Sequence, residues 1–211
     1  RRLMGFCRTN LFKRLESSGK VFLQSVERHI LRNYIYLHAI ENDEQIPIGT
    51  QEPEMLDARI YDEDADAPDV TLNIFDDDDE KVIDTHQTAS LRTEKDFKRR
   101  AAEIYEDYSK NYKNRFKWLR PAHFVKSLAI DLRNDAQALQ GILQKAGEWN
   151  EKKDAKLNAL VALITKTHPN EKILVFSQFA DTVRYLVAKL KAAGVKRLAG
   201  VTGDSSDPTT L

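Results

Sequence analysis

The sequence has 211 residues, which is enough for one large domain or two small ones. Hydrophobic residues make up 41% of it, but no stretch reaches the ~20 apolar residues of a membrane helix and no signal peptide is visible, so we expect no membrane partner. A single cysteine excludes an internal disulfide and suits the cytoplasm, and the five histidines lack ligand-like spacing, so we expect no metal site.

Charge is segregated along the chain although the net charge is zero. Residues 1–40 carry eight Lys/Arg against two Glu, residues 41–96 carry four against nineteen acids, and residues 97–126 carry nine against three. Blocks of opposite sign indicate segments with different roles. We therefore divide the chain into basic helices, an acidic insertion, long helices and a final α/β part, with the boundaries 1–41, 42–92, 93–150 and 151–211.

Residues 8–41 show a helical pattern. Apolar residues recur three and four positions apart and fall on one face, namely Phe22, Val26, Ile30, Tyr34 and Leu37. The triplet Ser17-Ser18-Gly19 either breaks this helix into two or is absorbed as a weak point.

Residues 42–92 have a different composition, with several prolines and an acidic run over residues 76–80. Such a stretch buries too little apolar surface to offset chain entropy, so we expect a loop or a disordered insertion. It is either a solvated spacer, the reading we favour, or a shield for a basic surface.

Two long helices are predicted next. The first spans residues 93–119, where Thr93 is the N-cap, Asp96 completes a capping box, and an apolar stripe runs to Leu119. Pro121 ends this helix and opens the next one, which stops at Gly147.

The hydrophobic pattern changes in the final part, residues 151–211. Asp154 caps a helix, residues 172–177 form an apolar strand, Asp181 caps a second helix that ends at Gly194, and residues 196–201 form another strand. Strand, helix and strand with short connections predict a βαβ unit with a parallel sheet. The expected fold class is therefore α/β with a large helical part: a helical insertion followed by a truncated βαβ parallel sheet.

Three strings carry a resemblance to a known family. Glu171-Lys-Ile-Leu-Val-Phe-Ser-Gln-Phe-Ala-Asp-Thr182 resembles the fourth motif of superfamily-two helicases, at the start of their second RecA-like lobe. Val201-Thr-Gly-Asp-Ser205 is similar to a strand-end turn of that lobe, and Arg8-Thr-Asn-Leu-Phe-Lys-Arg-Leu-Glu-Ser-Ser-Gly19 looks like the helices between the lobes. The resemblance covers residues 8–40 and 154–206 and is closest to bacterial Swi/Snf-like DNA helicases or translocases.

This resemblance implies a fragment of a DNA-dependent ATPase, with double-stranded DNA and the first RecA-like lobe of the parent protein as partners. ATP and magnesium would serve the intact parent. The sequence contains no Gly-x-x-x-x-Gly-Lys-Ser/Thr loop and no Asp-Glu-x-His, so we expect no catalytic residue and no ATP hydrolysis by this chain alone.

The resemblance also implies candidate DNA-binding residues. Ser177 and Gln178 follow the first predicted strand, and a turn after the second one could offer amides to a phosphate, through Thr202, Gly203 and Asp204. For Ser177 the stronger interpretation is a cap on the turn before the next helix, and for Gln178 the two interpretations are about even. The second turn could be an ordinary loop, and only the resemblance favours a phosphate contact there. Arg28 and Arg32 are candidates on different grounds, as basic residues of a possible phosphate-contacting surface, although a solvated helix face is the stronger interpretation for either one.

Further basic residues could extend a phosphate-contacting surface, namely Arg14, Lys20, Lys98, Arg99, Arg100, Lys113 and Arg115. For any one of them a solvated helix face is the stronger interpretation. Tyr105, Tyr108 and Tyr112 could stack on bases, but their helical spacing favours core positions. Two other functions stay open: a non-enzymatic helical adaptor for protein–protein interaction, and, ranked last, a nucleotide- or sugar-binding α/β enzyme.

Overall fold

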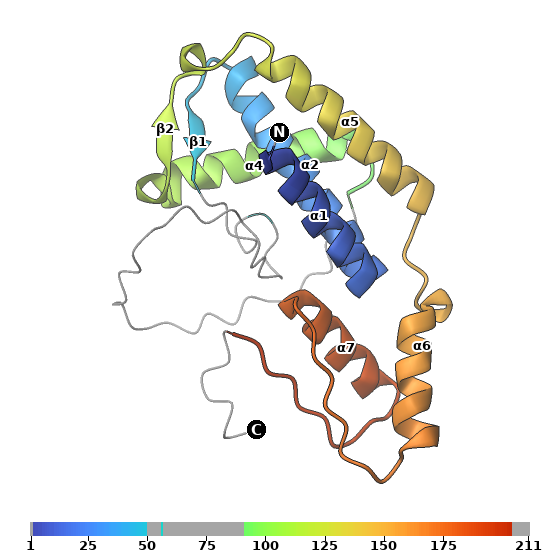
Figure 1. Ribbon diagram of the computed structural model, residues 1–211. Coiled ribbons are helices and arrows are strands. Elements are labelled where there is room, and N and C mark those ends of the chain that lie inside the picture. Colours follow the sequence, from blue (N-terminus) through green and yellow to red (C-terminus); the bar gives the residue numbers. More distant parts are fainter. Residues whose placement is uncertain (1, 50–55, 57–90, 204–211) are drawn as a thin grey trace.

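The computed structural model describes residues 2–49, 56 and 91–203, with side chains from Thr9 onward (Figure 1). A helical hairpin begins the chain: α1 (Arg2–Ser17) is followed by α2 (Gly19–Glu41). Ser18 between them has the extended angles φ −156° and ψ 127°. The Ser17-Ser18-Gly19 triplet therefore breaks the helix.

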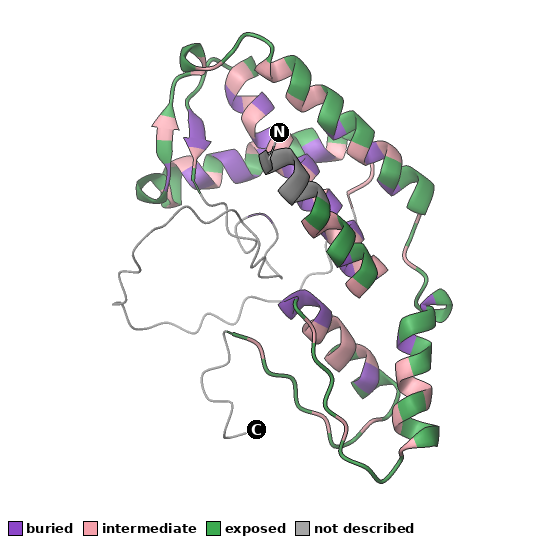
Figure 2. Cartoon of the chain, viewed as in Figure 1, coloured by how far each residue is buried: buried purple, intermediate pink, exposed green. Residues whose placement is uncertain are grey.

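α2 is the centre of the fold. Helices α4 (Glu94–Asn111) and α5 (Leu128–Ala146) pack against it, and Figure 2 shows how much of α2 is buried. The fully buried side chains of this core include Val26, Ile30, Ile35, Leu37, Phe97 and Tyr108. Removal of this apolar surface from water is the main stabilising contribution to the helical body.

The beginning of α4 confirms the predicted capping box. The Thr93 hydroxyl accepts a hydrogen bond from the Asp96 amide at 3.2 Å, and the Asp96 carboxylate accepts one from the Thr93 amide at 3.2 Å. The predicted continuation of this helix to residue 119 is wrong. α4 ends at Asn111 and a short 3₁₀ turn (Lys113–Arg115) follows.

A two-stranded antiparallel sheet replaces the last predicted turns of that helix. Strand β1 (Ile46–Ile48) pairs with β2 (Lys117–Leu119). Phe116 just before β2 is buried and stacks on Tyr108, with ring centroids 4.7 Å apart, so tertiary packing overrides the local helical period. β1 lies in the segment expected to be a loop; residues 50–55 and 57–90 of that segment lie outside the described residues.

The remaining helices are shorter. They are two 3₁₀ turns (Pro121–His123 and Glu151–Lys153), α6 (Ala155–Ala162), a π-helical turn (Leu163–Thr167) and α7 (Ala180–Ala192). Asp154 caps α6 as predicted, because its carboxylate accepts a hydrogen bond from the Leu157 amide at 3.0 Å. Gly147 and Gly194 have φ of +65° and +87° and follow α5 and α7, where the sequence placed the helix ends.

The predicted parallel βαβ sheet is wrong. Residues 172–176 and 196–201 flank α7 without regular secondary structure, and the two-stranded antiparallel sheet of β1 and β2 is the one sheet among the described residues (Figure 1). The first segment is not buried on both faces: Leu174 is 72% exposed and Phe176 is 89% exposed. A strand forms a sheet only by pairing with a neighbour, and an apolar run in the sequence does not supply one.

Candidate functional site

A buried ion-pair cluster joins α7 to the α1–α2 hairpin. One carboxylate oxygen of Asp181 lies 3.4 Å from a guanidinium nitrogen of Arg14 and 3.2 Å from one of Arg28. The second oxygen lies 3.5 Å from Arg184, one turn along α7. The side chains of Arg14, Arg28 and Asp181 are at most 5% exposed, so mutual pairing is what makes their burial tolerable.

This cluster corrects two predictions. Asp181 does not cap α7, since the N-cap is Phe179 and the Asp181 carboxylate faces the arginines. Arg28 was predicted to contact DNA, but it is 2% exposed and directed at Asp181, so it supports the site from within the protein. The Arg14 guanidinium also lies 4.8 Å from the ring centroid of Phe179, a cation–π contact.

Three hydroxyl groups meet beside the cluster. Ser17, the last residue of α1, has its oxygen 2.9 Å from that of Thr182 and 3.4 Å from that of Ser177. Ser177 also accepts a hydrogen bond from the Phe179 amide at 3.2 Å, so it fixes the turn before α7. Ser177 therefore has the local turn role that the sequence left open, and it also lies on the wall of a cleft.

The cleft itself lies between the end of α1, α6 and the start of α7 and has a volume of about 550 Å³. Its polar lining residues are Lys13, Glu16, Ser17, Lys156, Ser177, Gln178 and Thr182. Its apolar ones are Leu160, Val175, Phe176, Phe179 and Leu186. The volume falls within the range of about 300–1,000 Å³ typical of ligand pockets.

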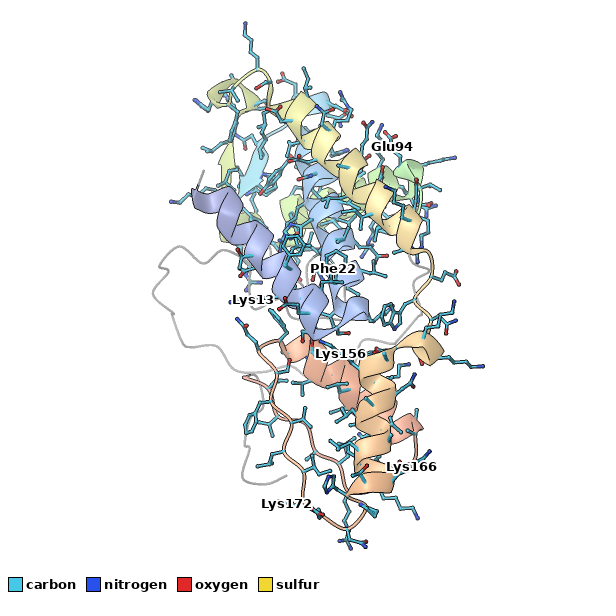
Figure 3. The ribbon with its side chains drawn as sticks, turned by 45° about the vertical axis from the view of Figure 1, so that its right-hand side comes forward. Lys13, Phe22, Glu94, Lys156, Lys166 and Lys172 are labelled. Atoms are coloured by element: carbon cyan, nitrogen blue, oxygen red, sulfur yellow. The ribbon has the colours of Figure 1, made fainter. Side chains whose placement is uncertain are left out.

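Two lysines from distant parts of the sequence give the cleft its positive groups. Figure 3 shows Lys13 and Lys156 near the junction of the upper and lower helices, and Lys166 and Lys172 at the far end of the lower part. The Lys156 ammonium donates a hydrogen bond to the backbone carbonyl of Glu16 and is thereby held at the end of α1. The cleft thus combines cations, hydroxyl groups and an amide, which can contact an anion such as a phosphate.

A second hydrogen-bond chain fixes α7 against α6. The indole of Trp149 donates to the Tyr185 hydroxyl at 3.2 Å, and that hydroxyl donates to Asp154 at 2.9 Å. Burial raises the pKa of Tyr185 to about 12, although the Trp149 hydrogen bond acts in the opposite direction. The Trp149 ring also packs on Gly19, where an added Cβ would lie 2.5 Å from two ring carbons.

The structure brings only part of the predicted site together. Ser177 and Gln178 line the cleft, whereas the lining does not include Arg32, Thr202 or Gly203. Arg32 and Thr202 are half-buried, Gly203 is exposed, and Asp204 lies outside the described residues. Five polar lining residues were not among the predicted site residues, namely Lys13, Glu16, Ser17, Lys156 and Thr182. Lys13, Glu16 and Ser17 lie in the Arg8–Gly19 string and Thr182 ends the Glu171–Thr182 string, but the resemblance assigned none of them a contact.

The other basic candidates behave mostly as a solvated helix face. On α4, Lys98, Arg99 and Arg100 pair with acids one turn away, at 2.8 Å from Glu94, 3.7 Å from Asp96 and 3.1 Å from Glu103 respectively. Tyr105 and Tyr108 are core residues as predicted, because they are 8% and 0% exposed.

No cluster of three or more His, Cys, Asp or Glu side chains within 2–49, 56 and 91–203 is arranged to hold a metal ion. No helix in that part of the chain combines the length and the apolar character needed to cross a membrane.

Comparisons with family models, with curated proteins and with solved structures found no match for this chain. A functional assignment therefore depends on the chain's own side chains and on the motif resemblance, which stays a prediction.

Proposed function

We propose that this chain is a DNA-contacting part of a Swi/Snf-like DNA translocase, and that the cleft between α1, α6 and α7 contacts the phosphate backbone. One observation carries the proposal. Ser177 and Gln178, which the motif resemblance singles out, lie in one cleft with Lys13 and Lys156, more than a hundred residues apart in the sequence. Contacts of this kind are independent of DNA sequence and sensitive to salt.

ATP and magnesium belong to the proposal only through the parent protein. The sequence lacks a phosphate-binding glycine loop and a Walker-type acidic motif, so we place ATP binding outside these residues. The role proposed for this chain is to hold DNA. The Asp181 cluster would hold the walls of the cleft in position, because it fixes α7 on the α1–α2 hairpin.

The test is a fluorescence-anisotropy titration with short duplex DNA over a range of salt concentrations. A plot of log K against log salt concentration has a negative slope, and each lost phosphate contact reduces the magnitude of that slope by about 0.9. The double variant Lys13→Gln, Lys156→Gln should therefore reduce the magnitude by roughly 2. The matched control is Lys166→Gln with Lys172→Gln, which removes two exposed lysines at the far end of the lower part. An equal reduction of the salt slope in both double variants would contradict the assignment of the phosphate contacts to the cleft.

A helical adaptor for protein–protein interaction is the second candidate. Three large apolar residues are exposed on α5 or just before it, namely Val125 at 71%, Ile130 at 57% and Ile142 at 41%. A protein partner is favoured only where such side chains form one contiguous patch, and these three are spread over residues 125–142, so they give this candidate weak support. This candidate predicts no DNA binding even at low salt.

A further inference from the structure

Phe176 lines the cleft. Its exposed fraction of 89% is the highest among the large apolar residues that the structure describes. Its neighbours Leu174 and Val175 are also exposed, at 72% and 50%. An aromatic ring in this position has almost all of its surface available to a ligand. Because lysines line the same cleft, we expect the ligand to carry a negative charge.

The turn that follows Phe176 is held by two contacts. The Phe179 amide donates a hydrogen bond to the Ser177 hydroxyl. Phe179 lines the cleft and is buried under the guanidinium of Arg14. The segment that carries Phe176 therefore leads directly into an anchored turn at the cleft wall.

The surroundings of Phe176 favour a nucleotide over a protein chain. Lysine is depleted at the centres of protein–protein interfaces, but two lysines line this cleft against one acid, Glu16, together with three hydroxyl groups and Gln178. Proteins that bind single-stranded nucleic acid combine a positively charged groove with aromatic rings on which bases stack. A paired base inside a duplex does not offer its face for such stacking.

We propose that the cleft takes one unpaired nucleotide of a DNA strand, with the base stacked on Phe176 and the phosphate beside Lys13 and Lys156. This inference rests on the proposed function and specifies its ligand. DNA with an unpaired segment next to a duplex is then the preferred substrate, because the duplex supplies backbone contacts and the unpaired base supplies stacking.

The experiment compares two labelled DNAs by anisotropy: a blunt duplex, and the same duplex with a short dT overhang. The wild-type protein should bind the overhang DNA more tightly. Phe176→Ala should remove that preference and weaken overhang binding by about 5- to 150-fold, the range for one stacked base. Phe176→Leu, which keeps apolar bulk without a ring, should behave like Phe176→Ala. The matched control is Phe12→Ala, because Phe12 is 55% exposed and is not part of the cleft lining.

Three results would overturn the inference. Equal binding of the two DNAs by the wild type is the first, and wild-type behaviour of Phe176→Leu is the second. The third is unchanged binding of the overhang DNA by Phe176→Ala, and a loss of self-association by this variant in sedimentation would then make this face a protein contact. In each case, a lowered salt slope in the Lys13→Gln, Lys156→Gln variant would leave the proposed function standing. Failure to bind either DNA at low salt would end both proposals.

Discussion

At the scale of single residues, Asp181 has the largest role in holding the cleft together. Its carboxylate lies within 3.4 Å of Arg14 and Arg28, which come from different helices of the hairpin. All three side chains are shielded from water, so each charge depends on the others for its stabilisation. A change to any of them should therefore affect both stability and the position of α7.

We predict that Asp181→Asn lowers the free energy of unfolding by about 3–5 kcal/mol, because it leaves buried guanidinium groups without the carboxylate charge. Urea denaturation followed by circular dichroism measures this change. The control is Glu94→Gln, which removes an exposed ion pair with Lys98 on α4 and should cost only about 0–1 kcal/mol. Similar losses in the two variants would show that the Asp181 cluster contributes no more than a surface pair.

Because of Tyr105, we predict that the free energy of unfolding depends on pH in the alkaline range. Its hydroxyl donates to the Gln45 carbonyl at 2.7 Å, and burial, reinforced by the nearby Glu44 carboxylate, raises its pKa to about 12. A tyrosine in the unfolded chain ionises near pH 10, so between about pH 10 and 12 the unfolded state loses its proton while the folded state keeps it. The stabilisation is complete below pH 10 and is lost as the pH rises toward 12.

Urea unfolding at pH 9 and pH 11 tests this dependence. We predict lower stability at pH 11, with a smaller decrease in Tyr105→Phe, which cannot ionise at this position. The same variant should be about 1 kcal/mol less stable than the wild type at pH 9, because it loses the hydrogen bond to Gln45. An identical decrease in both proteins would assign the pH dependence to other groups, such as Tyr185, whose pKa is also raised to about 12.

At the scale of elements, the α1–α2 hairpin contacts the segment after α5 at Gly19, and this joint has no space for a larger residue. Gly19 begins α2, and the Trp149 ring lies against it so closely that a methyl group would overlap two ring carbons. Gly141 offers the matching contrast, because it lies inside α5 with open space where its Cβ would be.

We predict opposite effects of the same substitution at these two glycines. Gly19→Ala should destabilise the protein by about 1–3 kcal/mol through overpacking, and it should shift the tryptophan fluorescence as Trp149 moves. Gly141→Ala should stabilise it by about 0.5–1 kcal/mol, since alanine favours a helix interior. Thermal unfolding of both variants measures the difference. Destabilisation by Gly141→Ala, or none by Gly19→Ala, would contradict the packing of this joint.

At the scale of the whole molecule, the sequence predicted local features better than long-range ones. The Thr93–Asp96 capping box and the Asp154 cap were predicted because each depends on neighbouring residues. The sequence marked Ser17-Ser18-Gly19 as a weak point but left open whether the helix breaks there, which it does at Ser18. The helix predicted to reach Leu119 failed because β2 pairs with β1, some seventy residues earlier, and a periodic pattern contains no information about that partner.

The candidate site shows the same limit. Ser177 and Gln178 were found through a local motif, and both line the cleft. Arg28 was assigned to DNA because a basic residue on a helix is normally exposed, yet its partner Asp181 lies 153 positions away. Lys13 lies within the Arg8–Gly19 string and Lys156 within residues 154–206, but the resemblance assigned no DNA contact to either lysine. Only the folded chain brings the two lysines to one cleft.

Hydrogen–deuterium exchange with and without duplex DNA at low salt locates the surface that contacts DNA. We predict that DNA binding slows exchange in the backbone amides of residues 13–19 and 175–182, which border the cleft. We predict little change in α4 and α5, which form the helical body and not the cleft lining. Protection confined to α4 and α5 would place DNA on another surface, and no protection anywhere under saturating DNA would contradict DNA binding by this chain.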